Sequence, residues 1–169
     1  MRENVFKEYK LTIHYSNTTG VRATCPDCHV PREWAHKLTR KIRATNDLFH
    51  WAVRSIDTKE KFEAKRDSLA RQVWAMMKSN NSQECRNYHD IDSMKTSEQT
   101  EKPRPFHELT VVWKMTCIDC HKGIAHKLPK EFDKEITMDQ LHDRLEKEKV
   151  NCESCHLNMA RPKSNNGWD

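Results

Sequence analysis

The sequence predicts a mainly α-helical fold with long irregular loops and an interior that side chains alone do not fill. Three observations lead to this prediction. Only 36% of the 169 residues are apolar, below the roughly 45–50% of ordinary globular proteins. Glycine occurs 3 times, against about 12 at average usage, and a hairpin-rich β-sheet needs glycine in its turns. The 7 cysteines and 10 histidines gather in short motifs.

The first expected helix begins near Pro31, since proline suits a first helical turn. Its apolar residues recur at helical spacing and would form one face. They are Trp34, Leu38, Ile42 and Phe49.

Two further helices are expected from capping signals at their first residues. Asp57 and Glu60 resemble a capping box at the start of a helix that ends near the polar run 79–82. Thr137 and Gln140 give a second such signal, and this helix runs to about residue 150. The polar stretch 92–105 is expected to be a loop, and 160–169 a frayed tail.

Charge and hydropathy argue against several classes of protein. The chain has 30 Lys+Arg and 25 Asp+Glu, and both signs alternate through 57–71 and 130–149, as on solvated helix faces. A nucleic-acid-binding protein would instead segregate its basic residues into a patch or stripe, so no nucleic-acid partner is expected. The longest apolar stretch, 109–113, is far shorter than the roughly 20 residues that span a bilayer. With no signal peptide visible, we expect a soluble chain without a targeting segment.

The pattern Cys-x-x-Cys-His occurs three times, which indicates covalent haem attachment of the c type. In this chemistry two thiols add across the haem vinyl groups, and the histidine binds the iron. A zinc site would use four ligands, whereas these motifs supply nine, and a disulfide framework does not explain the recurring histidine. The motifs are Cys25-Pro-Asp-Cys28-His29 (site 1), Cys117-Ile-Asp-Cys120-His121 (site 3) and Cys152-Glu-Ser-Cys155-His156 (site 4).

An incomplete motif, Cys85-Arg-Asn-Tyr88-His89 (site 2), has tyrosine where the second cysteine would stand. It accounts for the odd number of cysteines. We expect Cys85 to hold a haem by a single thioether, with His89 as its axial ligand, which brings the total to four haems c. The alternative is an inactive site with a free cysteine.

Each haem iron takes a second axial ligand, usually His or Met. The proximal ligands expected from the motifs are His29, His89, His121 and His156. The distal candidates are His14, His107, His126 and His142, with Met159 as a rival to His142. His107 and His142 each lie ten residues before the first cysteine of a haem motif, and His14 lies eleven residues before Cys25, which suggests a repeated lead-in segment. Which distal histidine serves which haem stays open. For His36 and His50, packing or contact with haem propionates is favoured over ligation.

The segments 13–17, 18–31 and 116–126, together with Gln83-Glu84-Cys85-Arg86-Asn87, resemble the NapC/NirT family of multihaem cytochromes c. These are membrane-anchored quinol dehydrogenases that feed periplasmic reductases. The resemblance covers about residues 1–130, and it implies distal-ligand roles for His14, His107 and His126. It also implies a quinol pocket near Lys41 and Asp47, whose alternative role is ordinary helix surface.

Family members carry an anchor helix and a first haem motif ahead of the stretch that matches residues 2–9, so we expect this chain to lack both. Site 4 lies beyond the usual end of the family, as in pentahaem relatives. We therefore expect a haem core with three sites at 1–133, then a C-terminal helix with an extra haem motif and a tail at 134–169.

Together these features predict a small helical multihaem cytochrome c with a haem-filled core, largely unfolded without haem. Its expected function is periplasmic electron transfer in a respiratory chain, by resemblance between a quinol pool and a periplasmic reductase or other redox protein. The alternatives are a haem-wiring subunit of a larger membrane redox complex and a multihaem reductase with one open iron. Expected partners are redox proteins and a membrane-anchored subunit or quinol-oxidising complex, and an oligomer is compatible with the sequence. Association with the membrane would come through a missing anchor or through a partner.

Overall fold

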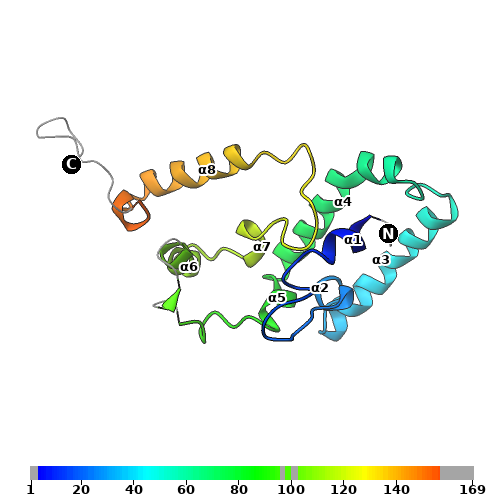
Figure 1. Ribbon diagram of the computed structural model, residues 1–169, viewed down its shortest axis with the longest axis horizontal. Helices are drawn as coiled ribbons and strands as arrows, with labels where there is room; N and C mark the ends of the chain where they lie inside the picture. The colour runs from blue at the N-terminus through cyan, green and yellow to red at the C-terminus, as the bar shows by residue number, and fades with distance from the viewer. Residues whose placement is uncertain (1–3, 96–97, 100–102, 157–169) are drawn as a thin grey trace, which may run out of the picture. The chain divides into compact units, whose positions relative to one another are not determined.

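The computed structural model describes residues 4–95, 98–99 and 103–156 (Figure 1). Within these ranges the chain is helical, as expected, and no β-strand occurs. Met159 and the expected tail at 160–169 lie outside the described residues. The helices are α1 (Val5–Tyr9), α2 (Cys25–His29), α3 (Trp34–Ala52), α4 (Lys59–Ser79), α5 (Gln83–Arg86), α6 (Pro103–Val112), α7 (Cys117–Cys120), α8 (Lys134–Lys147) and the short 3₁₀ helix η2 (Cys152–Ser154).

The chain divides into two compact units. Unit 1 comprises residues 1–94 and 115–132 and holds α1 to α5 together with α7. Unit 2 comprises residues 95–114 and 133–169 and holds α6, α8 and η2. One boundary between the units falls between residues 132 and 133, and the second domain was expected to begin at residue 134. Residues 95–114 group with the C-terminal segment, and the division into 1–133 and 134–169 stays a prediction.

The three expected helices are present, but their first residues differ from the expected ones. α3 starts at Trp34 after Glu33, and Pro31 lies buried before the helix. α4 is capped by Thr58, whose hydroxyl accepts a hydrogen bond from the N–H of Lys61. Asp57, expected in this role, instead pairs with the Lys61 ammonium at 2.8 Å.

α8 likewise starts earlier than expected. Asp133 caps it by accepting hydrogen bonds from the N–H groups of Glu135 and Ile136, at 2.8 and 3.2 Å. Thr137, the expected cap, lies one turn inside the helix and donates its hydroxyl to the carbonyl of Asp133. Aspartate and threonine both qualify as caps, and the sequence alone does not rank them.

α6 was not expected, because its first residues lie in the polar stretch 92–105. Unit 2 supplies its partners. The Trp113 indole, which follows α6, donates a hydrogen bond to Glu148, at the end of α8. The guanidinium of Arg144 lies 4.2 Å from the centroid of the Trp113 ring and pairs with Glu148. Tertiary contacts of this kind override weak local signals.

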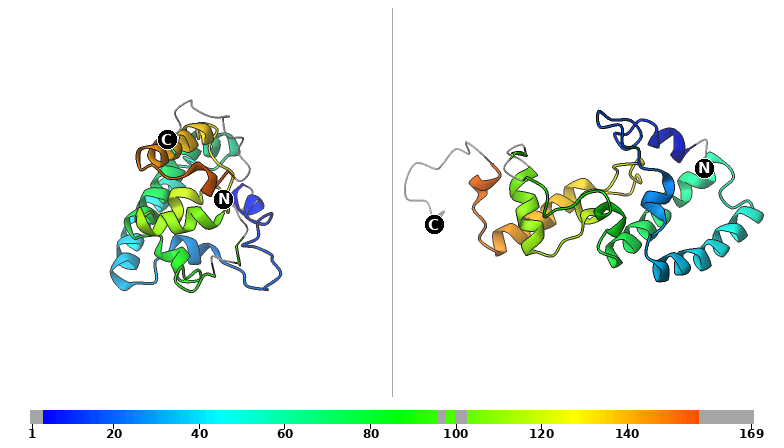
Figure 2. Two further views of the ribbon diagram at one scale, coloured as in Figure 1. Left: turned by 90° about the vertical axis from the view of Figure 1, so that its left-hand side faces the viewer. Right: turned by 90° about the horizontal axis from the view of Figure 1, so that it is seen from below.

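The apolar residues of α3 that share one face, as expected from their periodicity, are not part of a side-chain core. Trp34, Ile42 and Phe49 are 75%, 63% and 62% exposed. The residues of α3 that are half-buried, Arg40 among them, lie on the opposite, polar side of the helix. α3 and α4 follow one another and splay apart (Figures 1 and 2), and polar residues of α3 line a pocket with the end of α4.

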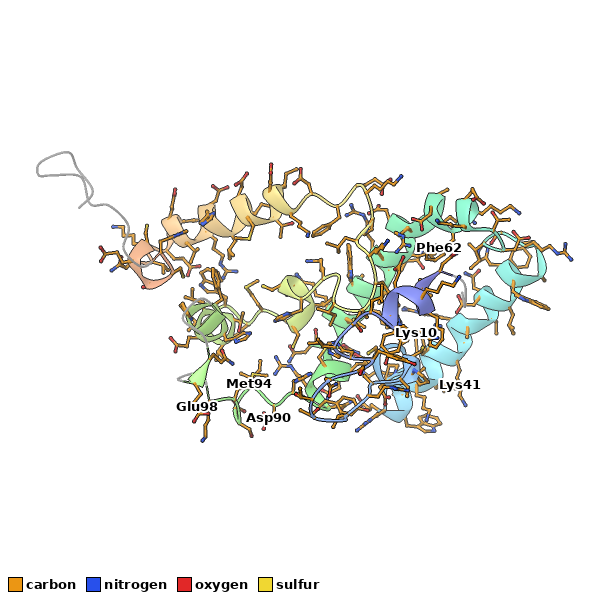
Figure 3. The ribbon with its side chains drawn as sticks, in the orientation of Figure 1. Lys10, Lys41, Phe62, Asp90, Met94 and Glu98 are labelled. Carbon is orange, nitrogen blue, oxygen red and sulfur yellow. The ribbon has the colours of Figure 1, made fainter. Side chains whose placement is uncertain are left out.

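Among the described residues, and apart from two prolines, only four apolar side chains are buried: Tyr9, Phe62, Met77 and Ile118. All four belong to unit 1, and Phe62 projects from the first part of α4 (Figure 3). A side-chain core of this size is far smaller than a chain of 169 residues needs. The sequence-based expectation of an interior filled by something other than side chains therefore agrees with the observed burial.

A buried ion-pair network joins α1, α4 and the loop after α7. The Arg66 side chain is 8% exposed, and its guanidinium contacts both carboxylate oxygens of Glu8 at 2.6 and 3.0 Å. It also pairs with Glu63 at 2.8 Å and donates to the carbonyl of Lys127 at 3.0 Å. Burial raises the pKa of Glu8, but the hydrogen bonds from Arg66 and from the N–H of Lys127 outweigh it, and the pKa is lowered overall.

We expect Arg66→Met to lower the free energy of unfolding of the holoprotein by about 3 kcal/mol, because it leaves the Glu8 carboxylate buried without its cation. The control is Arg71→Met, which removes an exposed pair with Asp67 on the same helix and should cost less than about 0.5 kcal/mol. Denaturant titration followed by circular dichroism measures both changes. Equal effects of the two variants would contradict the structural role of Arg66.

Candidate haem sites

Each haem motif forms one helical turn, which brings its first cysteine and its histidine to the same side. In sites 2, 3 and 4 the histidine N–H donates to the carbonyl of the first cysteine, at 2.9, 2.8 and 2.8 Å. In site 1 the same five residues form α2. Because side chains at i, i+3 and i+4 share a helix face, the thiols and the imidazole point to one side. Site 2 keeps this turn although Tyr88 replaces a cysteine.

Sites 1 and 3 share a further device, a capping box that fixes the start of the turn. The carboxylate of Asp27 accepts hydrogen bonds from both the N–H and the hydroxyl of Thr24, at 2.7 and 2.5 Å. Asp119 does the same for Thr116, at 2.9 Å in both cases. The hydrogen bonds from Thr24 and from Tyr88 lower the pKa of Asp27 to about 2. Both caps keep an acidic residue at a helix N-terminus, where it is favoured.

Three of the expected proximal histidines face a second histidine at nearly the same separation. The ring centroids of His29 and His126 are 6.2 Å apart, and those of His14 and His89 are 6.3 Å apart. Two imidazoles on opposite sides of one metal ion, each with a metal–nitrogen bond of about 2 Å, have their centroids about 6 Å apart. The two spacings in unit 1 therefore fit an iron between each pair of rings.

Unit 2 contains the third pair. His142, on α8, and His156, after η2, have ring centroids 6.1 Å apart with 24° between the ring planes. Asn151 holds the turn of site 4 by accepting a hydrogen bond from the N–H of Glu153 at 2.9 Å. At site 4, therefore, the histidine of the lead-in segment (His142) faces the histidine of the haem motif that follows it (His156). In unit 1 it does not, because His14 precedes site 1 but faces the histidine of site 2.

The remaining candidates, His107 and His121, belong to different units. Within unit 2, the Nδ1 atom of His107 lies 2.7 Å from the side-chain oxygen of Gln99. Within unit 1, His121 follows α7 and keeps the backbone hydrogen bond of the haem turn. The ligand roles of both histidines stay predictions.

Burial favours the neutral, metal-binding form of His14, His29 and His126 in unit 1. It lowers the pKa of His29, with smaller contributions from His126 and Arg40, and it also lowers the pKa of His126. The pKa of His14 is lowered by burial and by His89. The Nδ1 atoms of His14 and His126 are buried without a hydrogen-bond partner. Since only neutral imidazole binds a metal, these rings fit axial ligation of haem.

The distal histidines of unit 1 are positioned by residues that the sequence analysis did not single out. The Tyr9 hydroxyl lies against the carbonyls of His14 and Ala23, and the N–H of Ala23 donates to His14 at 3.1 Å. This contact fastens the His14 loop beside site 1. The Glu8–Arg66 network holds both backbone groups of Lys127, the residue after His126. Tyr9 lies in the stretch 2–9 quoted for its family resemblance, which was the available signal.

The thiols of Cys85 and Cys117 are neighbours. A hydrogen bond between them raises the pKa of Cys85 and lowers that of Cys117. Buried Ser82, in left-handed backbone conformation before α5, accepts a hydrogen bond from the N–H of Ile118 at 3.2 Å. Sites 2 and 3 therefore lie side by side in unit 1.

The other histidines and the expected quinol residues lie on or next to α3. His36 pairs with Glu33 at 3.5 Å, and the Nδ1 atom of His50 lies 3.0 Å from the Ser55 hydroxyl. Asp47 forms an ion pair with Arg40 at 3.2 Å. Lys41 is exposed (Figure 3). The Asp47 carboxylate is thus already paired with Arg40. The quinol role of Lys41 and Asp47 stays a prediction.

Comparison with known proteins gives a consistent result. The model of the NapC/NirT cytochrome c family, N-terminal region, matches residues 1–131. The denitrification system component NirT of Stutzerimonas stutzeri is 55% identical over 135 residues, which cover 80% of this chain and 67% of NirT. The cytochrome c-type protein NapC of Escherichia coli strain K12 is 51% identical over 129 residues, covering 76% of this chain and 64% of NapC.

A putative tetraheme cytochrome-c type protein of Allochromatium vinosum is 49% identical over 128 residues, covering 76% of this chain and 70% of that protein. The chain thus spans about two thirds of the length of these relatives. No solved structure matches it. In the described ranges, none of the helices combines the length and apolarity that crossing a bilayer requires.

We expect His126→Gly to leave the iron of site 1 with one axial histidine. The variant should show a high-spin ferric signal in electron paramagnetic resonance and should bind cyanide, because the ring facing His29 is gone. His50→Gly is the control, since the His50 ring contacts Ser55 and not a proximal histidine. An unchanged low-spin spectrum for His126→Gly would show that His126 is not a ligand.

Proposed function

Because this chain belongs to the NapC/NirT cytochrome c family, we propose that it transfers electrons in a periplasmic respiratory chain between a quinol pool and a reductase or other redox protein. Haem c is the cofactor that this family implies. The redox chemistry belongs to the haem, while the protein supplies attachment, axial ligands and the surrounding dielectric.

The observation behind this proposal is the recurring geometry of paired histidines. At three sites a histidine of a haem turn faces a second histidine at 6.1–6.3 Å. An iron with two axial histidines has no open position for a substrate, so it favours electron transfer over catalysis at the iron. This supports a carrier over the alternative, a multihaem reductase.

We further propose four haems, one of them at Cys85 by a single thioether. Site 2 keeps the turn of the complete motifs, with the N–H of His89 bonded to the carbonyl of Cys85. Its histidine also faces His14 at the spacing seen in the other pairs. The proximity of the Cys85 and Cys117 thiols adds one competing outcome, a disulfide between them in an oxidising compartment.

Attachment to a larger membrane complex is the second candidate role. The exposed apolar face of α3 supports it, because a contiguous exposed apolar surface usually marks an interaction site. In that role the chain would connect the haems of a quinol-oxidising partner to a soluble reductase. Stable co-purification with a membrane subunit would support this role over that of a free carrier.

The spectrum of the ferric holoprotein tests the carrier proposal directly. We expect all irons to be six-coordinate and low-spin, with no binding of nitrite and with cyanide bound only weakly, above millimolar concentration, because each iron would have two protein ligands. Electron paramagnetic resonance and optical titration measure this. A high-spin iron that binds nitrite would instead favour the reductase.

Intact-mass measurement tests the haem count. We expect four haem masses and no alkylatable thiol, because all 7 cysteines would be used in thioethers. The haem at Cys85 should absorb at longer wavelength than the others, since its unused vinyl group stays conjugated with the ring. Three haems with an alkylatable Cys85, or a Cys85–Cys117 disulfide, would refute the single-thioether attachment.

A further inference from the structure

The tyrosine that replaces a cysteine in site 2 is directed towards site 1. Its hydroxyl donates a hydrogen bond to the Asp27 carboxylate and accepts one from Arg32 at 2.7 Å. The Arg32 guanidinium also lies 4.9 Å from the centroid of the Tyr88 ring and 4.0 Å from Asp27. These contacts join α5 to α2, two elements that pack together within unit 1. They are charge-assisted, and such hydrogen bonds are the stronger ones.

At site 3 the capping aspartate also contacts a side chain outside its own turn, but the contacting residue is a lysine. Asp119, the capping carboxylate of that site, accepts a hydrogen bond from the Lys78 ammonium at 2.7 Å. Each capping aspartate therefore connects its haem turn to one other segment, Asp119 to α4 and Asp27 to the residues that follow α5. Only the second connection reaches a residue inside another haem motif.

We propose that Tyr88 is a positioning residue that takes over the mechanical role of the missing thioether at site 2. Through Asp27 and Arg32 it holds the turn 85–89 against α2, so that His89 stays directed at the iron. The inference rests on the proposed attachment of a haem to Cys85.

The physical reason is the freedom that one thioether leaves to the haem. Two thioethers fix the plane of the macrocycle against the helical turn, whereas a single thioether allows rotation about its bonds. The axial bond to His89 then depends on how firmly the turn itself is held. Tyr88 stands directly before His89 in the chain, and its hydroxyl is fastened to two residues of the neighbouring segment. Fixing such a ligand from outside its own loop is how supporting contacts act in metal sites.

The test uses the four-haem holoprotein and the absorption component displaced to longer wavelength, which reports the singly linked haem. Tyr88→Phe removes both hydrogen bonds and keeps the ring. We expect the apparent dissociation constant of cyanide at this haem to fall roughly tenfold, because a charge-assisted hydrogen bond that positions the competing histidine is lost. The low-spin signal of this haem should shift in electron paramagnetic resonance, and the signals of the other haems should not.

Two matched variants separate positioning from general stability. Tyr88→Cys also removes the contact with Asp27 but restores a second thioether, so the long-wavelength component should disappear. The cyanide constant of the site 2 haem, followed here by its low-spin signal in electron paramagnetic resonance, should equal the wild-type value. Lys78→Met removes the equivalent partner of Asp119 and keeps Tyr88, so it should leave the cyanide constant of the singly linked haem unchanged.

The possible outcomes are distinct. Three haems in the wild-type protein would refute the attachment at Cys85 and this inference with it. Four haems with an unchanged cyanide constant in Tyr88→Phe would overturn only the positioning role. Loss of all haems in Tyr88→Phe would show a general structural role and would also overturn it. Loss of the singly linked haem alone would support it.

Discussion

The separation between facing imidazole rings is the constraint on which the rest of this structure depends. Three pairs of histidines are held with their ring centroids 6.1–6.3 Å apart, a spacing that suits one metal ion between the two rings of each pair. The side chains around them do not form a continuous core, since, apart from two prolines, only four apolar residues are buried among those described. In such a chain, bonds from histidine to iron and the faces of the haem would take the place of apolar packing. We therefore expect folding and haem attachment to be one process.

The polypeptide still has to bring each pair together from distant parts of the chain. The buried Arg66 network does this for His126, because Glu8 and Arg66 hold the backbone of the next residue, Lys127. Tyr9 does it for His14 by fastening the loop to the segment before site 1. Both sets of contacts are made by residues of α1, Glu8 in the first and Tyr9 in the second. Residues of the short helix α1 thus hold the two histidines, His14 and His126, that are expected to be the distal ligands in unit 1.

Features set by a few consecutive residues could be predicted from the sequence, and features set by tertiary contacts could not. The helical turn of a haem motif is set by five consecutive residues, and site 2 keeps it despite Tyr88. The partner of each histidine is set by tertiary folding, so the regular spacing before sites 1, 3 and 4 did not reveal that His14 faces His89. The periodicity of α3 predicted an apolar face but could not show that this face is exposed, because the side of α3 that lines the pocket with α4 is polar. α6 was missed because its partners, Arg144 and Glu148, lie far along the chain.

The order of contacts within unit 1 connects these local turns into a path suited to electron transfer. Site 1 touches site 2 through Asp27 and Tyr88, and site 2 touches site 3 through Ser82 and Ile118 and through the thiols of Cys85 and Cys117. Each haem turn is therefore in contact with the next, and haems bound there would lie in the same order. The loss of one cysteine at site 2 falls in the middle of this series, where an unattached haem would interrupt it. A side chain that fastens the middle turn to its neighbour consequently matters for the whole series, and Tyr88 makes such a contact.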